Sequence, residues 1–160
     1  MDEELQRLSQ VIEETSATRI IVLGDLIHAK IGMTKSLINK VAEWRKTFSG
    51  KILVIKGNHD RSWKSLPLEW NIEWITEWNE EPFSFSHEPQ ASKDRFVWSG
   101  HLHPTFRVKG RSDAIRLPCF HVGKQVGVLP AFNFFTRGLE MPRGKTDKVY
   151  VIAEDKVIKV

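Results

Sequence analysis

Two short apolar runs, each closed by a glycine, constrain the fold of this chain more than any other feature. Residues 19–24 have the sequence RIIVLG, and residues 51–57 have the sequence KILVIKG. Continuous apolar runs of this length are typical of strands buried on both faces of a parallel sheet. Between them, Leu37, Ile38 and Val41 recur at helical spacing, and Ser49-Gly50 ends the helix near Phe48. The pattern therefore predicts a β-α-β unit with parallel strands.

The remainder of the chain combines one more helix with many short strands. Residues 3–15 have the apolar spacing of an amphipathic helix. Beyond Asp60 the helical spacing fades, and alternation and turn residues predict strands at 72–76, 83–86, 95–99, 106–109, 114–122, 125–130, 148–153 and 156–160. We expect a single α/β domain over residues 1–160, built from two packed sheets with helices outside them.

Composition limits the classes of function. The 24 Lys and Arg residues outnumber the 20 Asp and Glu residues, which gives a net charge of +4 and a pI of about 9.3. This balance favours polyanionic partners such as nucleic acid, although an ordinary solvated basic surface gives the same balance. The acidic N-terminus is not a signal peptide, and no apolar run approaches the ~18 residues of a membrane span. The single cysteine, Cys119, fits a cytoplasmic location.

Four polar segments follow predicted strands directly. They are Gly24–His28 (GDLIH), Gly57–Asp60 (GNHD), His87 and Gly100–His103 (GHLH). The carboxyl ends of strands in an open α/β sheet are the edge at which ligands bind. Each segment alone is more often an ordinary turn or a structural histidine. Their occurrence together, in order, at strand ends predicts a metal site.

The residue types in these segments are metal ligands. Asp25 offers a carboxylate that can bridge two cations, and Asn58 offers a neutral oxygen. The side chains of His87, His101 and His103 offer imidazole nitrogens. Mixed oxygen and nitrogen donors suit Mn²⁺, Fe²⁺ or Zn²⁺ better than Ca²⁺. Mn²⁺ is the first expectation, and Zn²⁺, Fe²⁺ or Mg²⁺ are the alternatives.

The ordered set of segments resembles the signature of the calcineurin-like metallophosphoesterases. Longer stretches, among them VLGDLIHAK, GNHDR, SHEP, GHLHP, RLPCF and LPAF, resemble the bacterial ligase-associated DNA damage response endonucleases. The resemblance extends from about Leu5 to the C-terminus. It implies a two-sheet α/β/β/α sandwich that holds two divalent metal ions.

The resemblance also assigns roles by position. Asp25 would bridge the two metals, and Asn58, His87 and His101 would complete one site. The other site would receive His103. The histidine at position 59 would face the phosphate and assist catalysis, and Asp60 would orient it by a hydrogen bond.

One part of the family pattern has no counterpart in the sequence. The family begins with a strand that ends in Asp-x-His, and those two residues ligate the second metal. The only aspartate before Asp25 is Asp2, and no Asp-x-His precedes Asp25. We therefore expect a domain that is truncated at its N-terminus relative to the family, with one tightly held metal in place of the two that the family holds.

Three functional readings follow. The first is a metal-dependent phosphodiesterase, in which metal-activated water attacks a nucleic acid or nucleotide phosphoester during DNA repair, in functional association with a ligase, a helicase and an exonuclease. The second is a protein that binds metal, phosphate or nucleic acid without turnover, and the third is an inactive fragment.

Several other residues carry weaker expectations. His28 lies near the predicted cleft and could contact substrate, or it could be a loop histidine with a local hydrogen bond. Arg61 follows the GNHD segment and could contact substrate phosphate, or it could be an ordinary exposed basic residue. We expect His121 to serve packing or the surface, and Cys119 to be a buried, inert thiol.

Overall fold

The computed structural model describes residues 2–27, 30–110, 113–133, 136 and 138–160. The predicted substrate contact His28 lies outside the described residues. The contacts between residues divide the chain into two compact units, Met1–Thr76 and Glu77–Val160. Each unit is therefore described by itself. Among the described residues, no helix is both long enough and apolar enough to cross a membrane.

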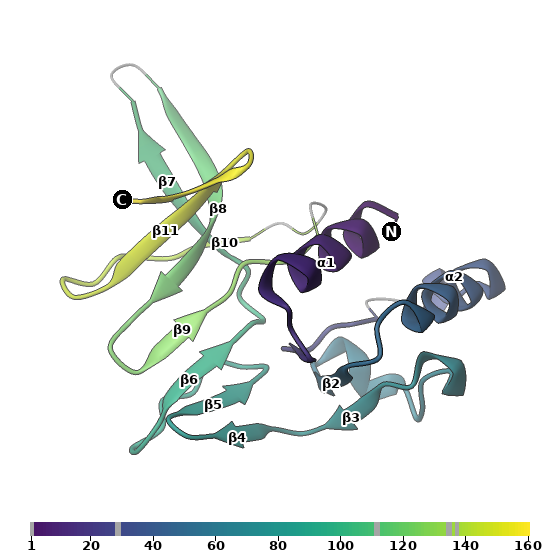
Figure 1. Cartoon of the computed structure of the whole chain (residues 1–160). Helices are drawn as coiled ribbons and strands as arrows, with labels where there is room; N and C mark the ends of the chain where they lie inside the picture. Colours follow the sequence, from purple (N-terminus) through teal and green to yellow (C-terminus); the bar gives the residue numbers. More distant parts are fainter. Residues whose placement is uncertain (1, 28–29, 111–112, 134–135, 137) are drawn as a thin grey trace. The chain divides into compact units, whose positions relative to one another are not determined.

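The first unit contains the predicted β-α-β unit (Figure 1). It comprises α1 (Asp2–Thr15), β1 (Arg19–Val22), η1 (Lys30–Gly32), α2 (Lys35–Lys46), β2 (Lys51–Ile55), η2 (His59–Ser62), η3 (Leu68–Trp70) and β3 (Glu73–Ile75). The strands form a parallel sheet in the order β1-β2-β3, with Val22 opposite Val54. Thr34 caps α2, because its hydroxyl accepts the Leu37 N–H at 3.2 Å. The predicted parallel pairing is thus confirmed.

The central strand β2 forms the core of this unit. Its residues from Ile52 to Ile55 are buried, as the continuous apolar run predicts. Ile52 and Val54 pack with Phe48, and partly buried residues from α1 and α2, including Ile12 and Trp44, complete this cluster. The helices therefore bury their apolar stripes on the sheet, which is the main source of stability in a unit of this kind.

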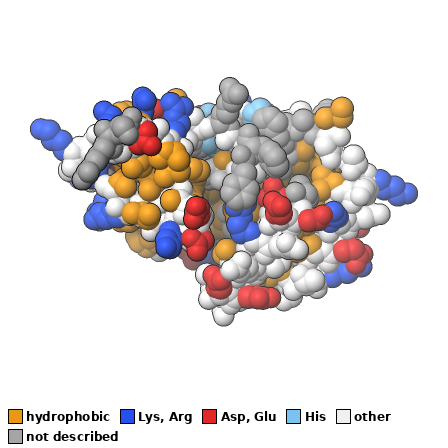
Figure 2. Space-filling view, turned by 90° about the horizontal axis from the view of Figure 1, so that it is seen from above, with side chains coloured by type: hydrophobic (Ala, Val, Ile, Leu, Met, Phe, Trp, Pro, Cys, Tyr) orange, Lys and Arg blue, Asp and Glu red, His pale blue; other side chains and the backbone are white. Residues whose placement is uncertain are grey.

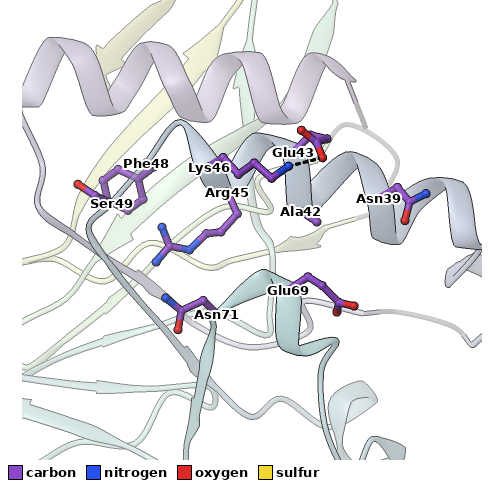
Figure 3. Close-up of a pocket in the computed structure, with 9 residues that line it drawn as sticks. All are labelled: Asn39, Ala42, Glu43, Arg45, Lys46, Phe48, Ser49, Glu69 and Asn71. Carbon is purple, nitrogen blue, oxygen red and sulfur yellow. Dashed lines mark hydrogen bonds and ion pairs between the residues drawn. The ribbon is translucent and has the colours of Figure 1, made fainter.

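A pocket of about 830 Å³ lies beside α2 (Figure 3). Arg45 crosses it, and its guanidinium donates to the Trp70 carbonyl at 3.1 Å and to the Gly50 carbonyl at 2.8 Å. Ser49 and Asn71, which also line the pocket, precede β2 and β3. The pocket therefore lies at the amino ends of these strands. The predicted ligands follow the carboxyl ends, so the pocket is separate from the candidate site.

The second unit is a sheet of nine strands, and its described residues contain no helix. It comprises β4 (Trp78–Glu80), β5 (Phe83–Ser86), β6 (Phe96–Ser99), β7 (Pro104–Lys109), β8 (Ala114–Val122), β9 (Val126–Val128), β10 (Leu139–Glu140), β11 (Lys148–Ala153) and β12 (Lys156–Lys159). The main path runs β10-β7-β8-β9-β6-β5-β4, and β11 pairs with β8 and β12. The sequence predicted this strand-rich half, but not the short strands β4 and β10.

The sheet of the second unit has an apolar face centred on three fully buried side chains. Cys119, Val149 and Val151 form this cluster, and Phe106 and Leu117 pack against it. Burial raises the pKa of the Cys119 thiol from 9.0 to about 11. The thiol is therefore protonated at neutral pH and is a packing residue, in agreement with the expectation from sequence.

Gly127 in β9 is required by the packing of two aromatic rings. A Cβ atom at this position would lie 2.4 Å from the Trp98 ring and 3.1 Å from the Phe96 ring. The two rings themselves form an edge-to-face pair with centroids 5.0 Å apart. A side chain at position 127 would therefore force this pair apart.

Replacing Gly127 with Val should destabilise the protein by about 1–3 kcal/mol, because overpacking displaces the Trp98 ring. Urea unfolding followed by tryptophan fluorescence measures the change. Gly32→Ala is the matched control, since a Cβ atom there would meet nothing within 4 Å. Equal unfolding midpoints for Gly127→Val and Gly32→Ala would contradict this account of the packing.

Candidate functional site

The first unit brings two polar loops to one edge of its sheet. The loop after β1 carries Asp25, and the loop after β2 carries Asn58 and His59. Because β1 and β2 are parallel and in register, both loops leave the sheet at the same end. The Asp25 carboxylate accepts the backbone N–H of His59 at 3.0 Å. Three of the residues predicted from sequence therefore lie together.

Gly57 makes the close approach of these loops possible. A Cβ atom at this position would lie 2.2 Å from Asp25 Oδ1 and 2.5 Å from the Asp25 backbone nitrogen. Asp25 itself has a left-handed backbone, with φ of 52°, and Gly24 before it has φ of 90°. Few residues other than Gly adopt this conformation, and Asp is one of those that do. The loop is therefore held in an unusual shape that aims the Asp25 carboxylate.

Asp60 holds the two loops together, which differs from its predicted role. Its side chain is fully buried. One carboxylate oxygen accepts the Gly57 N–H at 3.0 Å and the Leu26 N–H at 3.3 Å, and the other accepts the Ile27 N–H at 3.1 Å. These contacts are with backbone groups, whereas the prediction had Asp60 orienting the His59 imidazole. The sequence could not distinguish these partners, because adjacent residues in a tight turn can face opposite sides.

The other residues of the GNHD loop have graded exposure. Asn58 is half-buried, and both His59 and Arg61 are exposed to solvent. Because the buried Asp60 carboxylate holds the loop, the exposed His59 side chain can meet a substrate without a change in the shape of the loop. The loop thus separates a structural residue, Asp60, from residues available for chemistry.

The second unit brings two histidines into direct contact. Strands β5 and β6 are parallel, with Ser86 opposite Ser99, and the chain places His87 and His101 just beyond those positions. The Gly100 N–H donates to the His87 carbonyl at 3.0 Å. The rings meet edge to face with centroids 4.8 Å apart, and His101 Nδ1 lies 3.0 Å from His87 Nε2.

The separation of these two nitrogens fits a shared cation. Nitrogens that bind one ion at about 2.1 Å lie about 3.0–3.3 Å apart when they occupy neighbouring coordination positions. His87 is buried, and His101 is half-buried. Two imidazoles that meet in this way must either share a proton or direct both lone pairs at a common point. The pair is therefore suited to hold a metal ion.

His103 follows in the same loop and shares its unusual backbone. His101 and His103 have φ values of 64° and 46°, both left-handed. Gly138 gives the loop room, because a Cβ atom there would lie 2.1 Å from the His103 carbonyl oxygen. Two left-handed histidines in one loop indicate that side-chain placement is maintained at the expense of backbone strain.

His121 is separate from these loops within the second unit. It is the penultimate residue of β8, is buried, and has Nε2 at 3.3 Å from the Asp147 carboxylate. Its position agrees with the expected packing role.

Replacing Gly57 with Ala should weaken Mn²⁺ affinity about tenfold or more, because the added methyl group displaces the Asp25 carboxylate. Isothermal titration calorimetry measures the affinity, with Gly32→Ala as the control. Affinity equal to that of the unmodified protein in Gly57→Ala would contradict the close approach described above.

Comparison with known proteins identifies the family. The chain matches the model of the calcineurin-like phosphoesterases over residues 2–156. It is also similar to the crystal structure of the Pseudomonas putida nuclease MPE, with 35% sequence identity and a TM-score of 0.86. That match covers 98% of this chain and 78% of the nuclease chain. No curated protein sequence matches. The family model spans both units, so the chain belongs to the calcineurin-like phosphoesterase family.

Proposed function

We propose that this metallophosphoesterase hydrolyses phosphodiester bonds in nucleic acid. Family membership supports phosphoester chemistry, and the likeness to a nuclease at 35% identity supports a nucleic acid substrate. The observation that carries the proposal is the contact between His87 and His101, whose nitrogens lie 3.0 Å apart. This separation fits two ligands of one ion, and the family depends on divalent metals.

We propose further that the ligands of the two units bind the same metal centre. Asp25 and Asn58 would come from the first unit, and His87, His101 and His103 from the second. The family model supports this, because it treats residues 2–156 as one domain. Asp25 would bridge two ions, with Asn58, His87 and His101 completing the first site and His103 contributing to the second.

The donor set supports a particular class of metal. One carboxylate, one amide oxygen and three imidazoles suit Mn²⁺, Fe²⁺ or Zn²⁺, and we propose Mn²⁺. A divalent ion in such a site polarises the phosphoryl oxygen and makes water a stronger nucleophile at neutral pH. The strained loops of Asp25 and His101 hold their side chains ready for it.

The chain's own contribution to the chemistry centres on His59. Its backbone N–H is fixed by the Asp25 carboxylate, while its imidazole is exposed. We propose that the imidazole donates a hydrogen bond to the phosphoryl group and then a proton to the leaving oxygen. Arg61, exposed in the same segment, would attract the phosphate.

The wider biological setting is part of the same proposal. The resemblance of the motifs to ligase-associated endonucleases favours a cytoplasmic DNA repair enzyme with a functional link to a ligase, a helicase and an exonuclease.

Replacing His59 with Ala should lower kcat for bis(p-nitrophenyl) phosphate by about 10²- to 10⁴-fold, because a general acid is lost. Mn²⁺ affinity, measured by calorimetry, should change little. Lys93→Ala is the control, since Lys93 is an exposed residue of the loop between β5 and β6 and is not one of the predicted ligands.

Two outcomes would count against the proposal. Wild-type turnover in His59→Ala would remove His59 from the mechanism. Mn²⁺ binding by the unmodified protein without hydrolysis of the diester or of DNA would favour a binding protein over an enzyme.

A further inference from the structure

We infer that one face of the second unit's sheet binds the phosphate backbone of nucleic acid beside the cleaved bond. This basic face carries Arg107, Lys109, Arg116, Lys148 and Lys159. The inference rests on the proposed function and deepens it, because it names the surface that would hold a long substrate.

Strand register separates the basic residues from the apolar core. In β8 the buried Cys119 and its neighbour Leu117 point to the apolar face, so Arg116 points to the other. Arg107 pairs with Arg116 across β7 and β8, and therefore shares its face. Lys109 lies two residues further along β7 on that same face. All three residues are exposed.

Two further lysines extend this side of the sheet along β11 and β12. Val149 and Val151 point to the apolar core, so Lys148 and Tyr150 alternate to the opposite side. Lys159 pairs with Tyr150 and lies on that side as well. Both lysines are exposed. Figure 2 shows hydrophobic side chains gathered toward the left, where β7, β8 and β11 lie in Figure 1, with Lys and Arg as well as Asp and Glu side chains around them.

The pairing of Arg107 with Arg116 is unfavourable without an anion. Like charges directly opposite each other across a strand pair destabilise a sheet. Glu140 offsets only part of this cost, since its carboxylate pairs with Arg116 at 2.8 Å. Within the described part of the chain, no acidic partner is found for Arg107, Lys109, Lys148 or Lys159. A surface with unneutralised positive charge in one place is suited to a polyanion.

The distribution of charge along the chain supports the same conclusion. Residues 104–160 contain 11 Lys and Arg residues and five Asp and Glu residues. Residues 77–103 of the same unit contain two and five, respectively. The excess of positive charge in the second unit therefore belongs to the part of the sheet that carries the basic face.

The basic face begins next to the metal ligands of its own unit. β7 starts at Pro104, directly after His103. At about 3.3 Å per residue, Arg107 lies roughly 13 Å along the strand from His103. Phosphates of one duplex strand are spaced about 3.4 Å apart along the helix axis, so this length corresponds to about four nucleotides. A strand cleaved at the histidine end could therefore extend its neighbouring phosphates over β7 and β8.

The test uses the double variant Arg107→Gln with Lys109→Gln. It measures the affinity of this variant for a long substrate and its rate of hydrolysis of a short one. Fluorescence anisotropy with a labelled DNA oligonucleotide, in a His59→Ala background, reports binding without cleavage. We expect about tenfold weaker binding at low salt, and a slope of log K against log salt that is smaller by about two. The same double variant with His59 intact should hydrolyse bis(p-nitrophenyl) phosphate at a rate within twofold of that of the unmodified protein.

The matched control is Lys93→Gln with Lys124→Gln, which removes the same charge from exposed positions outside the basic face. Urea unfolding midpoints establish that both double variants are folded. If the Arg107→Gln with Lys109→Gln variant had the same DNA affinity and the same salt slope as the control variant, the inference would be overturned. If the double variant Arg107→Gln with Lys109→Gln lost affinity for anionic phospholipid vesicles to the same extent as for DNA, the inference would also be overturned. The basic face would then be a surface that binds lipid headgroups.

The two proposals fail separately. If the unmodified protein does not hydrolyse the small diester, but its DNA binding still depends on Arg107 and Lys109, the proposed catalysis fails and the basic face stands. If the diester is hydrolysed and the double variant binds DNA normally, the basic face fails and the catalytic proposal stands.

Discussion

The buried carboxylate of Asp60 is the interaction on which the geometry of the first unit's loops depends. It accepts backbone N–H groups from Leu26, Ile27 and Gly57, and so joins the loop after β1 to the loop after β2. A buried N–H group left without an acceptor in this place would cost about 1–3 kcal/mol. With the loops joined, Asp25 can adopt its left-handed backbone and accept the His59 N–H. A structural residue thus sets the positions of the Asp25 carboxylate and the His59 backbone.

In the second unit, strand pairing positions the candidate ligands. Its histidines are placed by parallel pairing of β5 with β6, and the Gly100 N–H fixes the His87 carbonyl. Left-handed backbone at His101 recurs here, as it does at Asp25. Both units therefore keep their candidate ligand loops in conformations that cost free energy, a cost that binding of the proposed metal would offset. The basic face on β7 and β8 adds affinity for long substrates without contributing to the chemistry.

Much of this arrangement follows from the sequence, and the exceptions have physical reasons. The runs RIIVLG and KILVIKG predicted two parallel strands, because uninterrupted apolar residues must be buried on both faces. The glycines and polar residues that follow these strands predicted that the candidate metal ligands lie at the carboxyl ends of the strands. The family that these motifs resemble is confirmed. The Leu26 and Ile27 partners of Asp60 could not be predicted, because they join residues 33 and 34 positions apart through loop conformation. The resemblance grouped His87 with His101, but the direct contact of their rings depends on loop conformation, which the residues alone do not give. Strands β4 and β10 were missed because two or three residues give no periodic signal.

The central claim is that Asp25 and His101 bind the same metal ion, and a double-mutant cycle tests it most directly. Mn²⁺ affinity would be measured by calorimetry for the unmodified protein, Asp25→Ala, His101→Ala and the double variant. Residues that share one ion should be strongly coupled, so the double variant should bind only slightly more weakly than either single variant. Losses of binding free energy that add, within about 0.5 kcal/mol, would show that the two residues act at separate places and would contradict a common centre.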